Sequence, residues 1–351
     1  MIESINGAVS GRPPRAKWER QVFTMNETKQ VRWAVLGTGV IANQMAAALQ
    51  AMGRALDAVG NRTYEKAVAF AEQYGVKKVY RDYHEMFTDP DIDAIYLTTP
   101  HNTHMAYLEQ ALSHGKHVLC EKSITLNSAE LARAAKLAEE NHVVLAEAMT
   151  IYHMPLYRAL RERVASGELG RVNLIQLNFG SFKDYDMKNR FFNRGLAGGA
   201  MLDIGVYALS LARLFLASNP DQVKSFVQKA PTGVDESAAI AMMNREGQLV
   251  TAALSLHSKQ PKRAVISCEK GYIEIMEYPR AEEAVIVDAA TGEREILQVG
   301  RTADALVYEL EDMEAAIRGE GGMLLPYTMD VMELMTALRS EWGVVYPEEE
   351  A

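Results

Sequence analysis

The sequence has few features of a secreted, metal-binding or membrane-spanning protein. Its 351 residues include only 2 cysteines, Cys120 and Cys268, with no Cys-x-x-Cys pair and no Cys/His cluster at metal spacing. We therefore expect no disulfide framework and no bound metal. No apolar run reaches the roughly 18 residues of a transmembrane helix, because Arg213 interrupts residues 208–217. Residues 1–24 also lack the apolar core of a secretory signal, so we predict a cytoplasmic protein with no membrane partner.

Positive charge is also scarce. The chain has 37 Lys and Arg against 46 Asp and Glu, a formal net charge of -9, which disfavours nucleic acid as the main partner. Hydrophobic residues make up 48% and charged residues 24%, as in ordinary globular proteins. A chain of this length usually forms about two domains.

The pattern of apolar runs divides the chain into three parts. Residues 1–29 have no periodic apolar face and are predicted to form a flexible arm. Residues 30–150 alternate short apolar runs with amphipathic segments, which predicts a doubly wound parallel sheet. In 151–351, several strand-like runs follow one another without helices between them. This predicts an α+β domain with a large, mostly antiparallel open sheet, closed by helices near 304–318 and 328–341.

A glycine-rich turn follows the first predicted strand, 31–36. Its sequence Gly37-Thr38-Gly39-Val40-Ile41-Ala42 opens an Ala-rich helix, the arrangement that binds a dinucleotide pyrophosphate. Gly37 permits the turn, Gly39 lets the backbone approach a phosphate, and Ala42 keeps helix and strand close. The motif is weak alone, and its position after the first strand strengthens it.

The end of the second predicted strand carries Asn61 and Arg62 and no carboxylate, since Asp57 lies near the start of that strand. An acid there binds the ribose hydroxyls of NAD, whereas an Arg accepts the 2′-phosphate of NADP. NADP is therefore favoured over NAD, although Arg62 is equally typical of a solvated residue at a helix start.

Two further groups carry candidate chemistry. Lys122 follows the strand 117–120, at the carboxyl edge where parallel sheets bind ligands; the alternative is a surface charge. Asp203, Tyr207 and Ser210 are spaced to form one polar stripe on an otherwise apolar helix, so we expect them to line a cleft. The alternative is an N-capping Asp and a buried Tyr bonded to a backbone carbonyl.

Taken together, these motifs and their separations resemble the Gfo/Idh/MocA oxidoreductases between about residues 31 and 342. The matching residues are Gly37–Ala42, Thr99-Pro100-His101-Asn102-Thr103-His104, Glu121-Lys122 and Asp203-Ile204-Gly205-Val206-Tyr207. Tyr207 points to the branch with dihydrodiol and D-xylose dehydrogenases and glucose-fructose oxidoreductase. The resemblance implies an N-terminal Rossmann domain, a substrate-binding and oligomerisation domain, an active site between them, and a homodimer or homotetramer formed through the open sheet.

The resemblance also implies roles for individual residues. Lys122 would orient the reacting hydroxyl, Tyr207 would exchange its proton, and Asp203 would position substrate or lysine. A cationic Lys is expected to let the Tyr phenol act as a base below its free pKa near 10. Thr99, Pro100, Asn102 and His104 match the loop under the cofactor, and Glu121 matches a contact to the nicotinamide ribose. Tyr152, His153 and Arg190 are candidates for contact with the substrate.

One position departs from the family pattern. The family generally has Pro after its Glu-Lys pair, often with a cis peptide, and this chain has Ser123. A cis bond before a residue other than proline costs about 2.5–4 kcal/mol, so we expect a trans Lys122–Ser123 peptide.

These features predict an NAD(P)-dependent oxidoreductase acting on a hydroxyl or carbonyl carbon of a sugar, polyol or cyclic diol. Two alternatives stay open. One is a redox-neutral glycoside-modifying enzyme with tightly held cofactor, and the other is a non-catalytic sensor that binds NAD(P).

Overall fold

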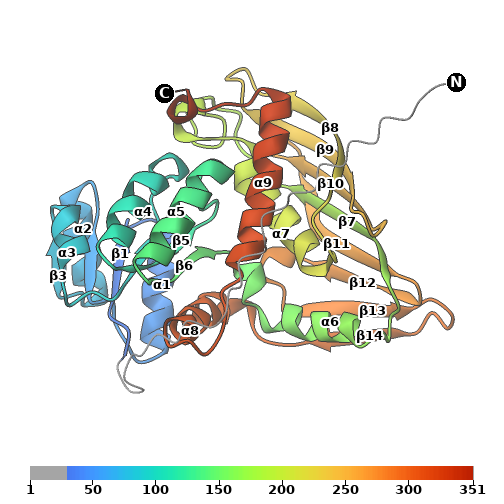
Figure 1. Ribbon diagram of the computed structural model, residues 1–351, viewed down its shortest axis with the longest axis horizontal. Helices are drawn as coiled ribbons and strands as arrows, with labels where there is room; N and C mark the ends of the chain where they lie inside the picture. Colours follow the sequence, from blue (N-terminus) through green and yellow to red (C-terminus); the bar gives the residue numbers. More distant parts are fainter. Residues whose placement is uncertain (1–29, 351) are drawn as a thin grey trace, which may run out of the picture.

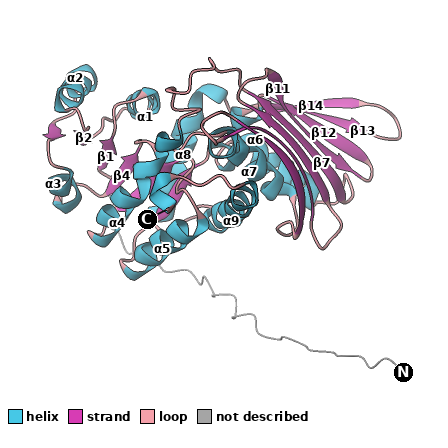
Figure 2. Cartoon of the chain, turned by 90° about the horizontal axis from the view of Figure 1, so that it is seen from above, coloured by secondary structure: helices cyan, strands magenta, loops and turns pink. Residues whose placement is uncertain are grey.

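A six-stranded parallel sheet forms the core of the N-terminal half in the computed structural model, which describes residues 30–350 (Figure 1). The strand order is β3-β2-β1-β4-β5-β6. The central strands β1 and β4 are buried along their whole length because helices cover both faces of the sheet (Figure 2). The elements are β1 (Trp33–Leu36), α1 (Val40–Ala51), β2 (Ala58–Gly60), α2 (Tyr64–Tyr74), β3 (Lys78–Tyr80), α3 (Tyr83–Thr88), β4 (Ala94–Leu97), α4 (His104–Ser113), β5 (His117–Glu121), α5 (Ser128–Glu140) and β6 (Leu145–Ala148).

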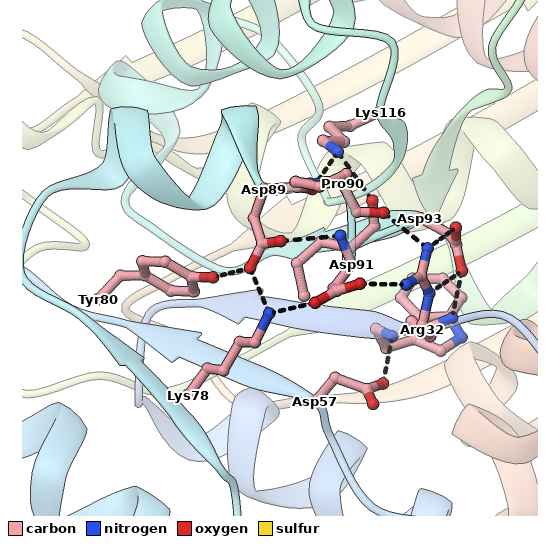
Figure 3. A network of polar contacts seen from close by, with 11 residues as sticks. Arg32, Asp57, Lys78, Tyr80, Asp89, Pro90, Asp91, Asp93 and Lys116 are labelled. Atoms are coloured by element: carbon pink, nitrogen blue, oxygen red, sulfur yellow. Dashed lines mark hydrogen bonds and ion pairs between the residues drawn. The ribbon is translucent and has the colours of Figure 1, made fainter.

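A network of charged side chains joins the amino ends of these strands (Figure 3). Arg32 binds Asp93 through Nε and Nη2 at 2.9 and 2.8 Å, and Lys78 Nζ lies 2.6 Å from Asp89 and 2.9 Å from Asp91. These contacts fix the loop before β4 against β1 and β3. The network lies at the opposite edge of the sheet from the strands' carboxyl ends, so it supports the fold and leaves the carboxyl edge free.

The second sheet has eight strands in the order β14-β13-β12-β11-β7-β10-β9-β8. Only β7 and β10 pair in parallel, and the other neighbours are antiparallel. The strands are β7 (Val172–Gly180), β8 (Gln222–Lys229), β9 (Asp235–Met243), β10 (Leu249–Ser255), β11 (Gln260–Cys268), β12 (Gly271–Met276), β13 (Glu283–Asp288) and β14 (Arg294–Gln298).

Helices cover one face of this sheet and leave the other open (Figure 2). They are α6 (Pro155–Ala165), α7 (Val206–Phe215) and α9 (Leu325–Trp342), whereas α8 (Ala305–Ile317) packs against α1 of the N-terminal half. The stretch Arg194–Phe215 is long and apolar enough to cross a membrane by composition, but 78% of its apolar window is buried in the protein, as in a core helix. On the open face Phe226 is 84% exposed.

The last two helices connect the two sheets. Glu314 of α8 accepts hydrogen bonds from Trp33 Nε1 at 2.9 Å and from Arg54 Nη1 at 2.6 Å. Arg339 of α9 is 2% exposed and donates to the Leu126 carbonyl in the loop after β5. The C-terminal helices thus hold the first sheet against the second and brace the loop that follows Lys122.

The fold class expected from the sequence is confirmed. The predicted strands and helices occur within a few residues of their expected bounds, and the 64–74 helix agrees at both ends. The three-residue strand β3 and the short helix α3 were not expected, because neither is long enough to show a periodic apolar pattern. The cap of α5 is Asn127, whose side chain accepts a hydrogen bond from Glu130 N. The predicted arm, residues 1–29, lies outside the described residues.

Candidate active site

The glycine turn forms at the carboxyl end of β1 and has the geometry of a phosphate cradle. Gly37 has φ +110°, and a Cβ there would lie 2.4 Å from Thr98 Oγ1 and 3.0 Å from the Thr98 carbonyl, so only glycine fits. A Cβ on Gly39 would meet nothing within 4 Å. Gly39 caps α1 without a side-chain hydrogen bond, and Val40 in the first turn is 79% exposed. The first amide groups of α1 therefore lie beside open space, which fits a dinucleotide pyrophosphate.

Asn43 was not expected from the sequence, and it braces this turn. Its Nδ2 donates to the Gly39 carbonyl at 2.7 Å and to the Thr38 carbonyl at 3.3 Å. Tyr74 of α2 in turn donates to Asn43 Oδ1 at 2.9 Å. Ala42 is fully buried, which lets α1 pack closely on the sheet as expected.

The carboxyl ends of β2 and β3 carry two arginines at the same edge. Arg62 is exposed, and no other described residue forms a hydrogen bond or ion pair with it. Asn61 Nδ2 donates to the Thr63 carbonyl at 3.0 Å. Arg81, which follows β3, stacks on the Tyr64 ring at 3.8 Å. Asp57 lies at the amino end, as expected, where its Oδ2 accepts from Trp33 N at 2.9 Å.

The three candidate catalytic residues come together between the two sheets. Lys122 Nζ donates to the Asp203 carbonyl at 2.7 Å and to Asp203 Oδ1 at 3.2 Å, and it lies 4.9 Å from the centre of the Tyr207 ring. The Lys122 and Asp203 side chains are only 13% and 14% exposed. Asp203 therefore positions the lysine directly.

Electrostatics at this cluster differ in part from the expectation. Burial opposes the charged forms of Lys122 and Asp203, but their mutual attraction raises the pKa of Lys122 and lowers the pKa of Asp203. Both groups are thus charged at neutral pH. Burial raises the pKa of Tyr207, and Lys122 only partly opposes this. The expected low pKa of the phenol is wrong, because burial outweighs a lysine that meets the face of the ring.

The polar stripe on the apolar helix is interrupted by a π turn. Residues Met201–Gly205 form this turn, and α7 begins at Val206. Asp203 and Tyr207 line the two cavities of the site, whereas Ser210 is fully buried because α7 is packed on almost every side. The expectation that Ser210 lines the cleft is therefore wrong. Asp203 is not the N-cap either, since that position is Ala200.

The Lys122–Ser123 peptide is cis, so the expectation of a trans bond is wrong. Contacts on both sides hold this conformation. His101 Nε2 lies 2.9 Å from the Lys122 carbonyl, His104 Nδ1 lies 3.1 Å from the Ser123 carbonyl, and the Ser123 hydroxyl donates to the Leu202 carbonyl at 2.9 Å. These long-range partners are not visible in the local sequence.

Part of the loop after β4, which was expected to contact the cofactor, faces a cavity. Thr99 and Pro100 line a cavity of about 200 Å³ together with Asp203, Arg190 and His101. Burial is the main reason that the pKa of His101 falls to about 3, so this ring is neutral.

Two other residues of that loop have structural partners. Asn102 Nδ2 donates to Glu348 Oε1 at 2.7 Å, and buried His104 bridges the Ser123 and Thr99 carbonyls. Neither residue lines this cavity.

Glu121 lies at the end of β5 beside other buried polar groups. Its Oε1 accepts a hydrogen bond from the Tyr96 hydroxyl, and burial raises its pKa. Glu309 of α8 is 2% exposed, and its Oε1 has no hydrogen-bond partner among the described residues. Burial and then the charge of Glu121 raise the pKa of Glu309 well above its usual value.

Two of the three expected substrate residues do not reach a described cavity. Tyr152 is buried and packs edge-on against Tyr327 of α9, with ring centres 6.4 Å apart. His153 is 2% exposed, and its Nδ1 lies 2.7 Å from Asp312 Oδ2. Both residues hold the segment after β6 in place. Arg190 does reach the site, with Nη2 3.8 Å from Asp203 Oδ1.

A larger cavity of about 630 Å³ connects the glycine turn with the catalytic cluster. Ile41 and Gln44 line it from α1, and Tyr207 and Arg280 line it from the C-terminal half. Arg280 Nη1 donates to Gln44 Oε1 at 3.0 Å across the two halves. No motif marks Arg280 in the sequence, because its role depends on a contact more than 200 residues distant along the chain.

Comparison with protein families agrees with this geometry. Residues 31–149 match the oxidoreductase family with an NAD-binding Rossmann fold, and residues 157–274 match the GFO/IDH/MocA C-terminal domain. The chain belongs to the Gfo/Idh/MocA oxidoreductase family. It shares 31% identity with trans-1,2-dihydrobenzene-1,2-diol dehydrogenase of Xenopus laevis, over 73% of this chain and 78% of the relative. The human enzyme of the same name is 29% identical, over 70% and 74% of the two chains.

Solved structures of this family share the fold. A 3-ketoreductase from Actinomadura kijaniata, solved with NADP and TDP-benzene, has a TM-score of 0.78 at 21% identity and covers 89% of this chain and 98% of its own. Levoglucosan dehydrogenase, solved with NADH and levoglucosan, has a TM-score of 0.81 at 17% identity, covering 89% and 97%. The family match given above confirms the expected oxidoreductase class with a Rossmann domain.

Proposed function

We propose that this family member is an NADP-preferring dehydrogenase or reductase that acts on a CH–OH or carbonyl carbon of a sugar, polyol or cyclic diol. The observation that carries the proposal is the 630 Å³ cavity, which is lined both by Ile41 of the glycine turn and by Tyr207. A cofactor held at the turn and a substrate held at Tyr207 share this space. The curated relatives named as diol dehydrogenases support the substrate class.

The cofactor, when bound, supplies or accepts the hydride. Gly37–Ala42 would hold its pyrophosphate, and Glu121 and the Thr99–Pro100 loop would face its nicotinamide end. The charged Lys122 donates a hydrogen bond to the substrate oxygen and stabilises negative charge that develops there. Asp203 keeps that ammonium in place through the contacts at 2.7 and 3.2 Å.

Tyr207 exchanges the substrate proton. Its raised pKa keeps the phenol protonated at neutral pH, so it is set to donate to the oxygen of a carbonyl as the hydride arrives. In the opposite direction the phenol must lose a proton first, which burial disfavours.

The preference for NADP rests on the edge of the sheet beyond β2 and β3. Arg62 is exposed and Arg81 is fixed on Tyr64, and these two guanidinium groups support a role in binding an adenosine 2′-phosphate. No carboxylate stands at the carboxyl end of β2 to bind the ribose hydroxyls of NAD.

Titration of the protein with NADPH and NADH, followed by nicotinamide fluorescence, tests this preference. We expect Arg62→Ala and Arg81→Ala to weaken NADPH binding by about tenfold or more each, consistent with the loss of a charge-assisted hydrogen bond, and to change NADH binding little. Lys66→Ala, a charge removal on nearby α2, serves as a control. Equal weakening of both cofactors would remove the 2′-phosphate argument.

We also propose that the open face of the eight-stranded sheet joins two copies of the chain. Its centre is formed by small or short side chains, Ala239, Ala241, Thr251 and Ala253, beside the exposed Phe226. Such a flat face permits close contact between sheets. Sedimentation velocity should give a dimer or tetramer for the wild type and a smaller species for Phe226→Asp.

A further inference from the structure

Positive charge around Asp203 exceeds what this one carboxylate neutralises. Lys122 and Arg190 both approach Asp203 Oδ1, at 3.2 and 3.8 Å. Burial lowers the pKa of nearby Lys183; Asp203 opposes this shift, and the charges of Arg190, Lys122 and Lys262 add to it. The charges of three cations thus act on Lys183 at this point.

Lys183 and Arg190 meet on a single aromatic ring. Lys183 Nζ lies 4.2 Å and Arg190 Cζ lies 4.5 Å from the centre of the Phe191 ring. No carboxylate among residues 30–350 forms an ion pair with Lys183, and Arg190 has only the long contact to Asp203, which it shares with Lys122. The two cations therefore contact one ring, and Asp203 is the one carboxylate among residues 30–350 that pairs with either of them.

Of these two cations, Arg190 lines the smaller cavity, and Lys183 contacts the Phe191 ring in its wall. Arg190 and Phe191 line its roughly 200 Å³ together with Asp203. Its volume is below the roughly 300–1,000 Å³ of a complete small-molecule site, so it fits one end of a substrate whose reacting carbon lies at Lys122 and Tyr207. Residues around the glycine turn, such as Gly39 and Gln44, do not line it, so the cations are not placed for the cofactor's pyrophosphate.

We propose that the substrate carries an anionic group, a carboxylate or a phosphate, which Lys183 and Arg190 bind beside the Phe191 ring. This inference rests on the proposed function and narrows its substrate class to acidic sugars or sugar phosphates. The guanidinium of Arg190 offers paired donors for such a group, and the Lys183 ammonium supplies a second charge. An anion bound there neutralises the two cations that now repel each other.

Exposed aromatic side chains in the same segment as Lys183 help to distinguish between the compounds that could carry the anion. Phe182 is 59% exposed and stacks on His257 with ring centres 5.4 Å apart, and Tyr185 is 47% exposed and lies 4.3 Å from the same ring. A nucleoside diphosphate sugar has a base that stacks on such a surface, whereas a free sugar acid or sugar phosphate does not.

Steady-state kinetics with matched substrates test the proposal. Glucose, glucuronate, glucose 6-phosphate and UDP-glucose, and their keto forms where they are available, are compared at saturating NADP(H). We expect at least one anionic compound to exceed glucose by tenfold or more in kcat/KM, with an advantage that declines as salt is raised. A selective gain for UDP-glucose would assign the anion to a nucleotide diphosphate. Equal kcat/KM for glucose and all three anionic compounds would overturn the proposal.

Variants localise the effect. Lys183→Met should raise KM for the preferred anion by about tenfold, as expected for the loss of a charge-assisted contact, and leave kcat within twofold because Lys183 does not touch Lys122 or Tyr207. Lys188→Met removes an exposed lysine from the same loop and should change neither constant. A lower kcat without a change in KM, or an equal effect of the two variants, would contradict an anion site.

A binding experiment separates this proposal from the proposed function. Thermal unfolding of the NADPH-loaded protein is measured with and without glucuronate or glucose 6-phosphate. We expect the anions to raise the unfolding temperature of the wild type more than glucose does, and Lys183→Met to abolish this difference. If NADPH binds and no compound is turned over, the rise in unfolding temperature with the anions still supports the anion site. In that case only the oxidoreductase proposal fails. If glucose turns over and the anions give no shift, the anion site alone fails.

Discussion

Replacement of Lys122 by Met should abolish turnover while the fold survives. The Lys122 ammonium donates hydrogen bonds to the carbonyl oxygen and to Oδ1 of Asp203, and it lies 4.9 Å from the centre of the Tyr207 ring. Methionine keeps most of the volume of the lysine stem and removes only the charge and the donors. The change therefore tests the role of the charged group and not the packing.

Two magnitudes follow from the geometry. Loss of one donor that stabilises the charge developing on the substrate oxygen typically costs about 10²–10³-fold, so we expect kcat to fall by roughly that factor. Breaking a buried ion pair costs about 3–5 kcal/mol. The 14% exposure of Asp203 and the nearby Arg190 reduce this penalty, and we expect a loss of about 2 kcal/mol in the free energy of unfolding.

The assay measures kcat and urea unfolding in parallel for three proteins. These are the wild type, Lys122→Met, and the double variant Lys122→Met/Asp203→Asn. Asparagine keeps the shape of Asp203 without leaving an unpaired charge, so the double variant should recover most of the lost stability and none of the lost turnover. This contrast separates the chemical role of the lysine from its structural one.

The reasoning is refuted if Lys122→Met retains turnover within a few-fold of the wild type. It is also refuted if the double variant recovers activity together with stability, since the lysine would then act only by holding the fold.

Further predictions concern the glycine turn and two carboxylates. Gly37→Ala should lower the free energy of unfolding by more than about 1 kcal/mol, because the new Cβ would clash with Thr98 and the residue has a positive φ. Gly39→Ala should leave the free energy of unfolding unchanged and weaken NADPH binding, which a fluorescence titration measures. Burial raises the pKa of Asp235 to about 7. The stability that the protonated carboxyl contributes is therefore complete at a pH below the pKa of Asp235 in the unfolded chain, and it is lost as the pH rises through 7. Asp235→Asn should therefore be more stable than the wild type at pH 8. In urea unfolding, the free energy of unfolding of the variant relative to that of the wild type should increase by roughly 3 kcal/mol between pH 4 and pH 8. Although burial opposes the shift, hydrogen bonds within the network of Figure 3 lower the pKa of Asp89 to about 2, so its contribution is present above pH 4 and lost as pH falls toward 2. Asp89→Asn should cost about 1 kcal/mol at pH 7 after solvent screening, and the cost should vanish at pH 2 in thermal unfolding.

Much of the fold and the centre of the site could be predicted from the sequence. The glycine turn, Lys122 and the Asp203–Tyr207 pair lie on elements whose apolar periodicity is strong, and each follows a strand or opens a helix where ligands bind. The short strand β3 could not be predicted, because three residues carry no period. The π turn at Met201–Gly205 is likewise invisible to an analysis that assumes 3.6 residues per turn.

Residues that depend on distant partners were also beyond the sequence. His101 contacts the Lys122 carbonyl, and Arg280 reaches Gln44 from the other half of the chain. The opposite error was made for Tyr152 and His153, because the resemblance to the family implied contact with the substrate and both proved to be buried structural groups. Burial also reversed the expected shift in the pKa of Tyr207, because the sequence indicates a neighbouring charge but not the loss of solvent.

The most direct test of the central claim follows nicotinamide absorbance when the purified protein is mixed with NADP(H) and a panel of neutral and acidic sugars, polyols and cyclic diols or their carbonyl forms. The account predicts stoichiometric oxidation or reduction of exchangeable NADP(H) with at least one compound, and loss of that reaction in Tyr207→Phe. Cofactor that binds at the glycine turn but is never consumed with any compound, or a Tyr207→Phe enzyme as active as the wild type, would contradict it.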